Sequence, residues 1–121
     1  MSFRELLAFK KSFSVAMKIF EISKKFPKEE KYSLTDQIRR SSRSVSANIS
    51  ESYRKRQYPK HFVSKLTDAD AENSETQTWL LFALECDYIN KETFNTLSLE
   101  NTEVGKLINY MINNPSKFGA K

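Results

Sequence analysis

The chain has 121 residues, 39% of them hydrophobic and 29% charged, which suits one folded domain with its own core and excludes a disordered chain. Its single cysteine, Cys86, excludes an intrachain disulfide, and no apolar stretch approaches the roughly 18 residues of a membrane span. The net charge of +5 hides two unequal halves: residues 1–65 carry 16 Lys and Arg against 6 Asp and Glu, and residues 66–121 carry 4 against 9. This separation indicates contact with a polyanion or with an oppositely charged protein face.

The N-terminal sequence MSFRELLAFKK places charges inside every apolar run and does not resemble a signal peptide, so we expect a cytoplasmic protein. Only two glycines and three prolines occur in the whole chain. Folds rich in β-sheet use many such residues in turns, so the scarcity favours a few long helices with short connections.

The first helix is expected at about residues 4–25. Leu6, Phe9, Phe13 and Phe20 recur at helical spacing, and Pro27 ends the segment because the residue before a proline is disfavoured in the α region. The second helix is expected at about residues 34–55, with Ser33 as its N-cap. Its apolar arc is narrow, and the small residues beside that arc would let a neighbouring helix approach closely. The arc and its small neighbours are Leu34, Ile38, Val45, Ile49, Ser41, Ser42 and Ala47.

The third helix is expected at about residues 59–88, with Pro59 at its first position, where a missing N–H costs nothing. Between Thr67 and Thr78 its only apolar side chains are two alanines. This zone should therefore either line solvent or pack small polar groups closely against another helix.

The fourth helix is expected at about residues 91–113, capped by Asn90 and ended by Pro115. Gly105 lies inside it and weakens it by about 1 kcal/mol relative to alanine, unless close packing uses the missing side chain. Four such segments with short loops predict an all-α fold, an antiparallel up-down-up-down four-helix bundle that forms one domain over residues 1–121.

A cationic surface is expected around the end of the second helix. Arg39, Arg43 and Arg54 project within about 60° of one another on a helical wheel, away from the apolar arc. The following connection interleaves basic residues with tyrosines, which suits phosphate contacts and stacking on unpaired bases. Cations are also common on solvated faces and at helix C-termini, so the solvated reading stays open. The candidate nucleic-acid-binding residues are Arg39, Arg43, Tyr53, Arg54, Lys55, Arg56, Tyr58, Lys60 and Lys65.

The acidic residues Asp68, Glu72 and Glu75 share one face of the third helix. We expect Glu51 and Glu75 to be buried or interfacial partners in ion pairs with Arg39, Arg40 or Arg43. No Glu-x-x-His motif, zinc-binding Cys/His set, P-loop or dinucleotide fingerprint occurs, so no metal or other cofactor is expected.

Arg56 and His61 match the loose Arg-x4-His pattern of HEPN-type ribonucleases. Pro59 separates the two residues, which argues against one continuous helix, and spacing alone cannot show that a general base reaches a substrate. We therefore expect no enzymatic activity and keep the ribonuclease as the least favoured alternative.

The stretch SLTDQIRRSSRSVSA (Ser33–Ala47) followed by NISESYRKR (Asn48–Arg56) resembles the four-helix-bundle proteins encoded by intervening sequences in 23S ribosomal RNA genes. The resemblance continues through Trp79 and Tyr88, and departs at Ser52, where the family usually has glycine. It implies compact bundles that associate into five-membered rings. It also implies a relation to the accessory variability protein of diversity-generating retroelements, which binds nucleic acid and a reverse transcriptase.

We therefore expect a non-catalytic, homo-oligomeric protein, a pentamer by resemblance, that binds RNA or DNA electrostatically and with little sequence selectivity, or acts as a scaffold. The alternative is a purely structural protein–protein interaction module. A reverse transcriptase is a possible protein partner, and no membrane partner is expected. The sequence does not specify the nucleic acid or the biological role.

Overall fold

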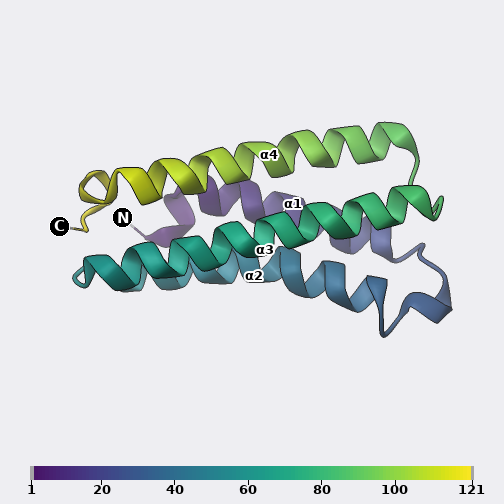
Figure 1. Cartoon of the computed structure of the whole chain (residues 1–121), viewed down its shortest axis with the longest axis horizontal. Coiled ribbons are helices and arrows are strands. Elements are labelled where there is room, and N and C mark those ends of the chain that lie inside the picture. The colour runs from purple at the N-terminus through teal and green to yellow at the C-terminus, as the bar shows by residue number, and fades with distance from the viewer. Residues whose placement is uncertain (1, 121) are drawn as a thin grey trace.

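Four long helices run along one axis in the computed structural model, which describes residues 2–120 (Figure 1). They are α1 (Leu7–Ser23), α2 (Leu34–Arg54), α3 (Pro59–Glu85) and α4 (Lys91–Asn113). Three short 3-10 helices, η1 (Phe3–Glu5), η2 (Lys28–Glu30) and η3 (Pro115–Phe118), flank or join them, and residues 2–120 contain no strand. The all-α, up-down-up-down four-helix bundle is confirmed, and both ends of the chain lie at the end of the bundle where α2 turns into α3.

The helix ends follow local backbone chemistry. At the start of the chain, Ser2 and Glu5 form a reciprocal capping box around η1, and Leu6 is extended, so α1 begins later than the expected residue 4. At the end of α3, Asp87 adopts a left-handed conformation with φ 62°, which stops that helix at Glu85.

The caps of α2 and α4 differ from each other. Asn90 caps α4 as expected, because its Oδ1 accepts the Thr93 N–H at 2.8 Å. Ser33 does not cap α2: its hydroxyl donates to Glu30 Oε1 at 2.6 Å, and the same carboxylate oxygen accepts the Leu34 N–H at 3.2 Å. The carboxylate of Glu30 therefore replaces the predicted serine cap.

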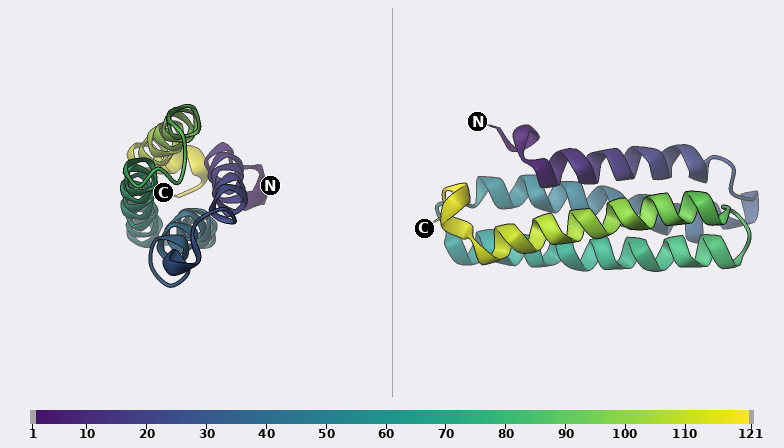
Figure 2. Two further views of the ribbon diagram at one scale, coloured as in Figure 1. Left: turned by 90° about the vertical axis from the view of Figure 1, so that its right-hand side faces the viewer. Right: turned by 90° about the horizontal axis from the view of Figure 1, so that it is seen from above.

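Each helix packs against the next along the chain, and α1 closes the bundle against α4 (Figure 2). The apolar arc predicted on α2 faces the centre, but the stripe predicted on α1 is only partly buried. Phe13 is 51% exposed and Phe20 is partly exposed, because α1 turns the neighbouring face, with Val15 and Ile19, towards the core. The fully buried large residues include Ile19, Ile38, Ile49, Phe62, Leu66, Leu80, Val104 and Ile108. No helix within residues 2–120 combines the length and apolar character that crossing a membrane would require.

A layer of small polar side chains crosses the middle of this core. Ser12 of α1 and Ser46 of α2 share a hydrogen bond of 2.8 Å, and Thr76 of α3 donates to Ser41 of α2 at 2.8 Å. These four residues are buried, and the space beside them does not admit a water molecule. The zone of the third helix that lacks large apolar side chains, residues 67–78, thus packs small polar groups against its neighbours, and the solvent-lined alternative is wrong.

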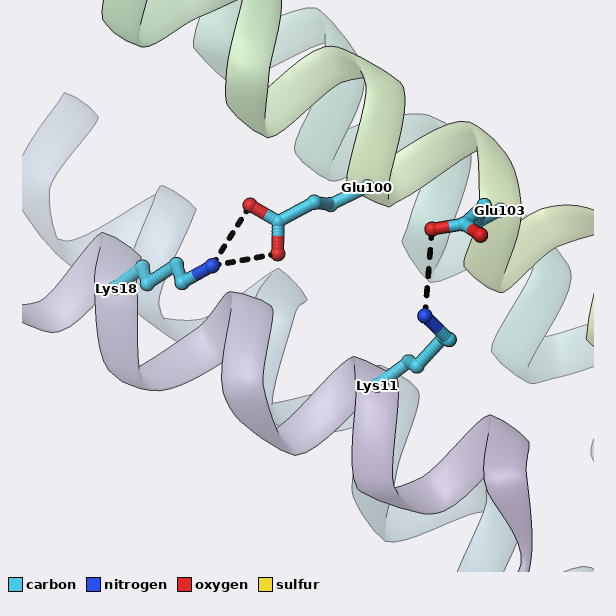
Figure 3. A network of polar contacts seen from close by, with 4 residues as sticks. All are labelled: Lys11, Lys18, Glu100 and Glu103. Atoms are coloured by element: carbon cyan, nitrogen blue, oxygen red, sulfur yellow. Dashed lines mark hydrogen bonds and ion pairs between the residues drawn. The ribbon is translucent and has the colours of Figure 1, made fainter.

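The acidic and basic halves of the chain partly neutralise each other on the surface between α1 and α4. Lys18 Nζ of α1 lies 2.7 Å and 2.8 Å from the two carboxylate oxygens of Glu100 of α4, and Lys11 lies 3.4 Å from Glu103 one turn along (Figure 3). Part of the charge separation along the sequence therefore serves the contact between α1 and α4.

Candidate nucleic-acid interface

The predicted cationic surface divides into two groups along α2. Arg39 and Arg43 lean towards α1, where both guanidinium groups lie against the ring of Phe20. Arg54, Lys55, Arg56 and Lys60 lie where α2 turns into α3. Arg43 and Arg54 are 11 residues apart in one helix, which places the groups about 16 Å apart at 1.5 Å per residue.

We call Arg54, Lys55 and Lys60 the corner cations. The chain leaves the helical conformation at Lys55, whose carbonyl accepts the Tyr58 N–H at 2.8 Å in a tight turn, and Pro59 then starts α3. All three side chains are exposed, and none has an ion-pair partner among residues 2–120. The short turn between two helices thus concentrates positive charge at one end of the bundle.

Arg56 is held in place by the C-terminal segment. Its guanidinium carbon lies 3.6 Å from the centre of the Tyr53 ring, its Nε donates to the Tyr53 carbonyl at 2.8 Å, and its Nη1 is 3.5 Å from the Phe118 carbonyl. Tyr53 is only 9% exposed. The prediction that Tyr53 offers a stacking surface is therefore wrong in this arrangement, because Arg56 and the surrounding chain cover its ring, and Arg56 is only partly available.

Tyr58, by contrast, is 56% exposed beside the corner cations, so its ring is available for stacking. The centre of the His61 ring lies 5.9 Å from that of Tyr58, and Arg56 points towards Tyr53 and Phe118. No hydrogen bond joins Arg56 and His61 in the described part of the chain. This geometry gives no support to the hypothesis of a ribonuclease pair.

The ion pairs expected for Glu51, Glu75 and Arg40 are not formed within the chain. Glu51 Oε2 lies 3.5 Å from Lys65 Nζ, and Arg40 Nε bonds to Asp36 one turn earlier at 3.0 Å. Glu75 accepts a hydrogen bond from Trp79 Nε1 at 3.2 Å. Both glutamates are exposed, so the intrachain part of that prediction is wrong: the arginines of α2 lean towards α1 or solvent, and α3 carries Glu75 away from them.

Lys65 is consequently the one predicted binding cation with a carboxylate partner within residues 2–120.

On α3, burial raises the pKa of Glu72, and the neighbouring charges of Glu75 and Asp68 raise it further. Residues 2–120 contain no group of three or more His, Cys, Asp or Glu arranged to hold a metal ion.

Sequence reasoning missed the residues of α1 that organise Arg39 and Arg43. Phe20 belongs to the predicted apolar stripe, yet its ring is partly exposed and contacts both guanidinium groups as well as Lys24 Nζ. We call Phe20, Lys24, Arg39 and Arg43 the Phe20 cluster. A helical wheel treats each helix separately, so it could not show that cations from α1 and α2 meet on one ring.

The fold and surface define an all-α four-helix-bundle protein with basic groups on α2 and at its turn into α3. The family model described as 23S rRNA-intervening sequence protein matches residues 4–110, and the chain belongs to this family. The match covers the bundle from η1 to the last turns of α4.

A similar solved structure is a protein of unknown function of the S23 ribosomal protein family from Bacteroides thetaiotaomicron. It is 30% identical, with a TM-score of 0.79, and the alignment covers 88% of this chain and 96% of the other. No protein with a curated description matches. The relation to the accessory variability protein stays a prediction.

Proposed function

We propose that this chain is a non-catalytic, homo-oligomeric protein that binds RNA or DNA through phosphate contacts. The observation that supports the proposal is the state of the corner cations: three exposed positive side chains lie side by side in sequence and turn, and no carboxylate of residues 2–120 neutralises them. When unpaired Lys and Arg side chains bind phosphates, they release the counterions condensed on the nucleic acid, and this release drives binding.

Binding would be mainly electrostatic. Arg54, Lys55 and Lys60 contact phosphates, and Tyr58 stacks on an unpaired base where the nucleic acid offers one. Phosphate contacts carry no sequence information, so selectivity for sequence should be weak.

Oligomerisation is supported by two separate apolar patches. The first is a groove of about 690 Å³ between α1 and α4, where Phe13 and Met17 are about half exposed. The second lies on α3, where Leu81 and Phe82 are about half exposed beside Trp79. Two different patches on one chain favour head-to-tail contacts between copies, and such contacts close into rings when the rotation allows. This observation also favours the second candidate function, a structural interaction module without nucleic acid.

A salt titration of binding to a structured RNA, a random-sequence RNA and duplex DNA tests the proposal. Affinity should fall steeply with ionic strength, with a slope of about 0.9 per phosphate contacted in duplex DNA. The triple variant Arg54→Gln, Lys55→Gln, Lys60→Gln should lower both affinity and slope. The control variant Lys28→Gln, Lys91→Gln, Lys106→Gln removes the same charge from exposed lysines elsewhere and should bind better than the corner variant.

No binding at low salt, or an affinity insensitive to salt, would overturn the nucleic-acid proposal. Light scattering across the same salt range tests how copies associate, which both candidate functions require. Copies held by apolar patches should stay associated as salt rises, whereas copies held by charge pairing should dissociate.

A further inference from the structure

Resting on the proposed function, we infer that the Phe20 cluster is a second phosphate-binding site, preorganised for one phosphodiester group of a nucleic-acid backbone. It lies on the face shared by α1 and α2, about 16 Å along α2 from the corner cations. The corner and the cluster would then contact separate phosphates of one bound molecule.

Three cations surround a single aromatic ring. Lys24 Nζ lies 4.8 Å from the centre of the Phe20 ring, the Arg39 guanidinium carbon 4.9 Å and the Arg43 guanidinium carbon 5.6 Å. All three distances fall within the range of cation–π attraction, which holds a cation near the ring without neutralising its charge. The ring therefore gathers positive charge and leaves that of the two guanidinium groups available.

A buried hydroxyl fixes one of the two guanidinium groups. Ser23 is 2% exposed, its hydroxyl donates to the Phe20 carbonyl at 3.0 Å, and its oxygen accepts Arg39 Nε–H at 2.7 Å. The orientation of Arg39 is thus set before any ligand arrives, while its Nη1 stays without a hydrogen-bond partner in the described chain. A planar guanidinium held in this way loses little conformational freedom on binding an oxyanion.

The charge balance favours an anion as the ligand. The carboxylate of Glu21 pairs with Lys24 at 2.8 Å, but no carboxylate of residues 2–120 pairs with Arg39 or Arg43. Two guanidinium groups on one ring repel each other, and a phosphate oxygen between them would replace that repulsion with charge-assisted hydrogen bonds.

The C-terminal end of α1 accounts for the position of Arg39 without a ligand, but not for that of Arg43. Arg39 Nη2 lies 3.5 Å from the Phe20 carbonyl, so Arg39 complements the negative end of the α1 dipole. Arg43 makes no hydrogen bond to any of residues 2–120 and is exposed. Cation–π attraction holds it against Phe20 and leaves its N–H groups free for a ligand that also reaches Arg39.

The test measures RNA binding by fluorescence anisotropy for Arg43→Gln and Phe20→Leu, with Phe9→Leu, at another partly buried ring of α1, as the matched control. Arg43→Gln should weaken binding about tenfold at low salt and lower the salt slope by about one phosphate contact. Phe20→Leu keeps an apolar side chain but loses the ring, so it should weaken binding about threefold with an unchanged slope. Phe9→Leu should bind like the parent protein.

A second measurement follows the Arg39 and Arg43 Nε–H signals by NMR during titration with inorganic phosphate. Both signals should shift in the parent protein, and the Phe20→Leu variant should respond at higher phosphate concentration. The response of the parent protein is independent of RNA binding and of any loss of stability in the Phe20 variant.

Three outcomes would overturn the inference. If the corner variant loses RNA affinity and Arg43→Gln does not, the proposed function stands and the second site is absent. If the Nε–H signals of Arg39 and Arg43 do not shift when phosphate is added, the Phe20 cluster is not an oxyanion site. If Arg43→Gln dissociates the oligomer, the cluster instead faces carboxylates of a second copy, such as Asp68 and Glu72 of α3. Failure of the parent protein to bind any nucleic acid would instead remove the proposed function.

Discussion

Asn73 of α3 and Asn101 of α4 are bonded reciprocally through the middle of the bundle. Asn73 Nδ2 donates to the Asn101 carbonyl at 2.9 Å, and Asn101 Nδ2 donates to the Asn73 carbonyl at 3.0 Å. Both side chains are buried. Each side-chain amide therefore binds one backbone carbonyl of the opposite helix. This pair of hydrogen bonds fixes the register of α3 against α4 and adds an α3–α4 contact to the polar layer.

Replacing either asparagine by alanine should lower the free energy of unfolding by about 2 kcal/mol, because the variant loses a buried hydrogen bond, leaves the facing carbonyl without that donor and opens a space in the core. Urea denaturation of Asn73→Ala and Asn101→Ala measures the loss. Asn95→Ala, an exposed change on α4, is the control and should alter stability by less than about 0.5 kcal/mol. Equal stability of all three variants would contradict the role of the pair.

Gly105→Ala should not stabilise the protein, although replacing a glycine inside a helix by alanine usually does. A Cβ at position 105 would lie 3.3 Å from Asn73 Nδ2, which cannot withdraw without lengthening its bond to the Asn101 carbonyl. We expect the packing conflict to cancel the gain in helix propensity of about 1 kcal/mol.

The same substitution in an Asn73→Ala background tests this explanation, because the obstructing amide is then absent. Gly105→Ala should become stabilising by up to about 1 kcal/mol in that background, so the two changes should be strongly non-additive in denaturation experiments. Purely additive energies would show that close packing is not the reason for the glycine.

Gly119→Ala should loosen the C-terminal segment. Gly119 has φ +89°, which alanine adopts at a cost of about 1–2 kcal/mol, and its added Cβ would lie 3.1 Å from Arg56 Nη1. Hydrogen exchange should speed up over residues 115–120 and change little in α1. Ser116→Ala, at an exposed position of the same segment, should leave exchange unchanged; if it accelerates exchange as much, the backbone at Gly119 is not the cause.

The carboxylate of Glu30 should stabilise the protein only while it is ionised. Hydrogen bonds from Ser33, Tyr88 and the Leu34 N–H lower the pKa of Glu30 below its ordinary value of 4.5, and the bond to Glu30 raises the pKa of Tyr88 to about 12. A carboxyl group whose pKa is lower in the folded than in the unfolded protein adds stability at a pH above its unfolded-state pKa. That stability is lost as the pH falls through its folded-state pKa. The raised pKa of Tyr88 adds stability below its ordinary value, and this is lost as the pH rises through about 12.

The measurement is the melting temperature of the parent and Glu30→Gln between pH 7 and pH 3. The parent should be the more stable at pH 7, and the difference should shrink below pH 4.5. Tyr88→Phe keeps the donors Ser33 and Leu34 to Glu30. Its melting temperature at pH 7 should therefore lie below that of the parent by less than that of Glu30→Gln does. A parent–variant difference that stays constant with pH would contradict this role of Glu30.

The helices could be predicted because their determinants are local. Apolar spacing, Pro27, Pro59 and the Asn90 cap act within a few residues, and the observed helix bodies follow from them. Helix ends were harder, since Glu30 reaches forward to replace Ser33 as the cap and Asp87 stops α3 through a positive φ.

The candidate site was predictable only as composition. The corner cations are consecutive or nearly so, and a short turn keeps them together wherever the helices pack. Tyr53 and Arg56 could not be placed, because their environment depends on Phe118 and Gly119, more than 60 residues later.

The amino-acid sequence by itself determined the number of helices, the buried face of α2 and the basic character of α2 and its following turn, since periodicity and local charge are properties of neighbouring residues. Tertiary structure decided which polar groups meet in the core, how much of the basic half is neutralised by α4, and that Phe20 gathers cations from two helices. Those outcomes depend on distances between segments far apart in the chain, which are set only when the four helices pack against one another.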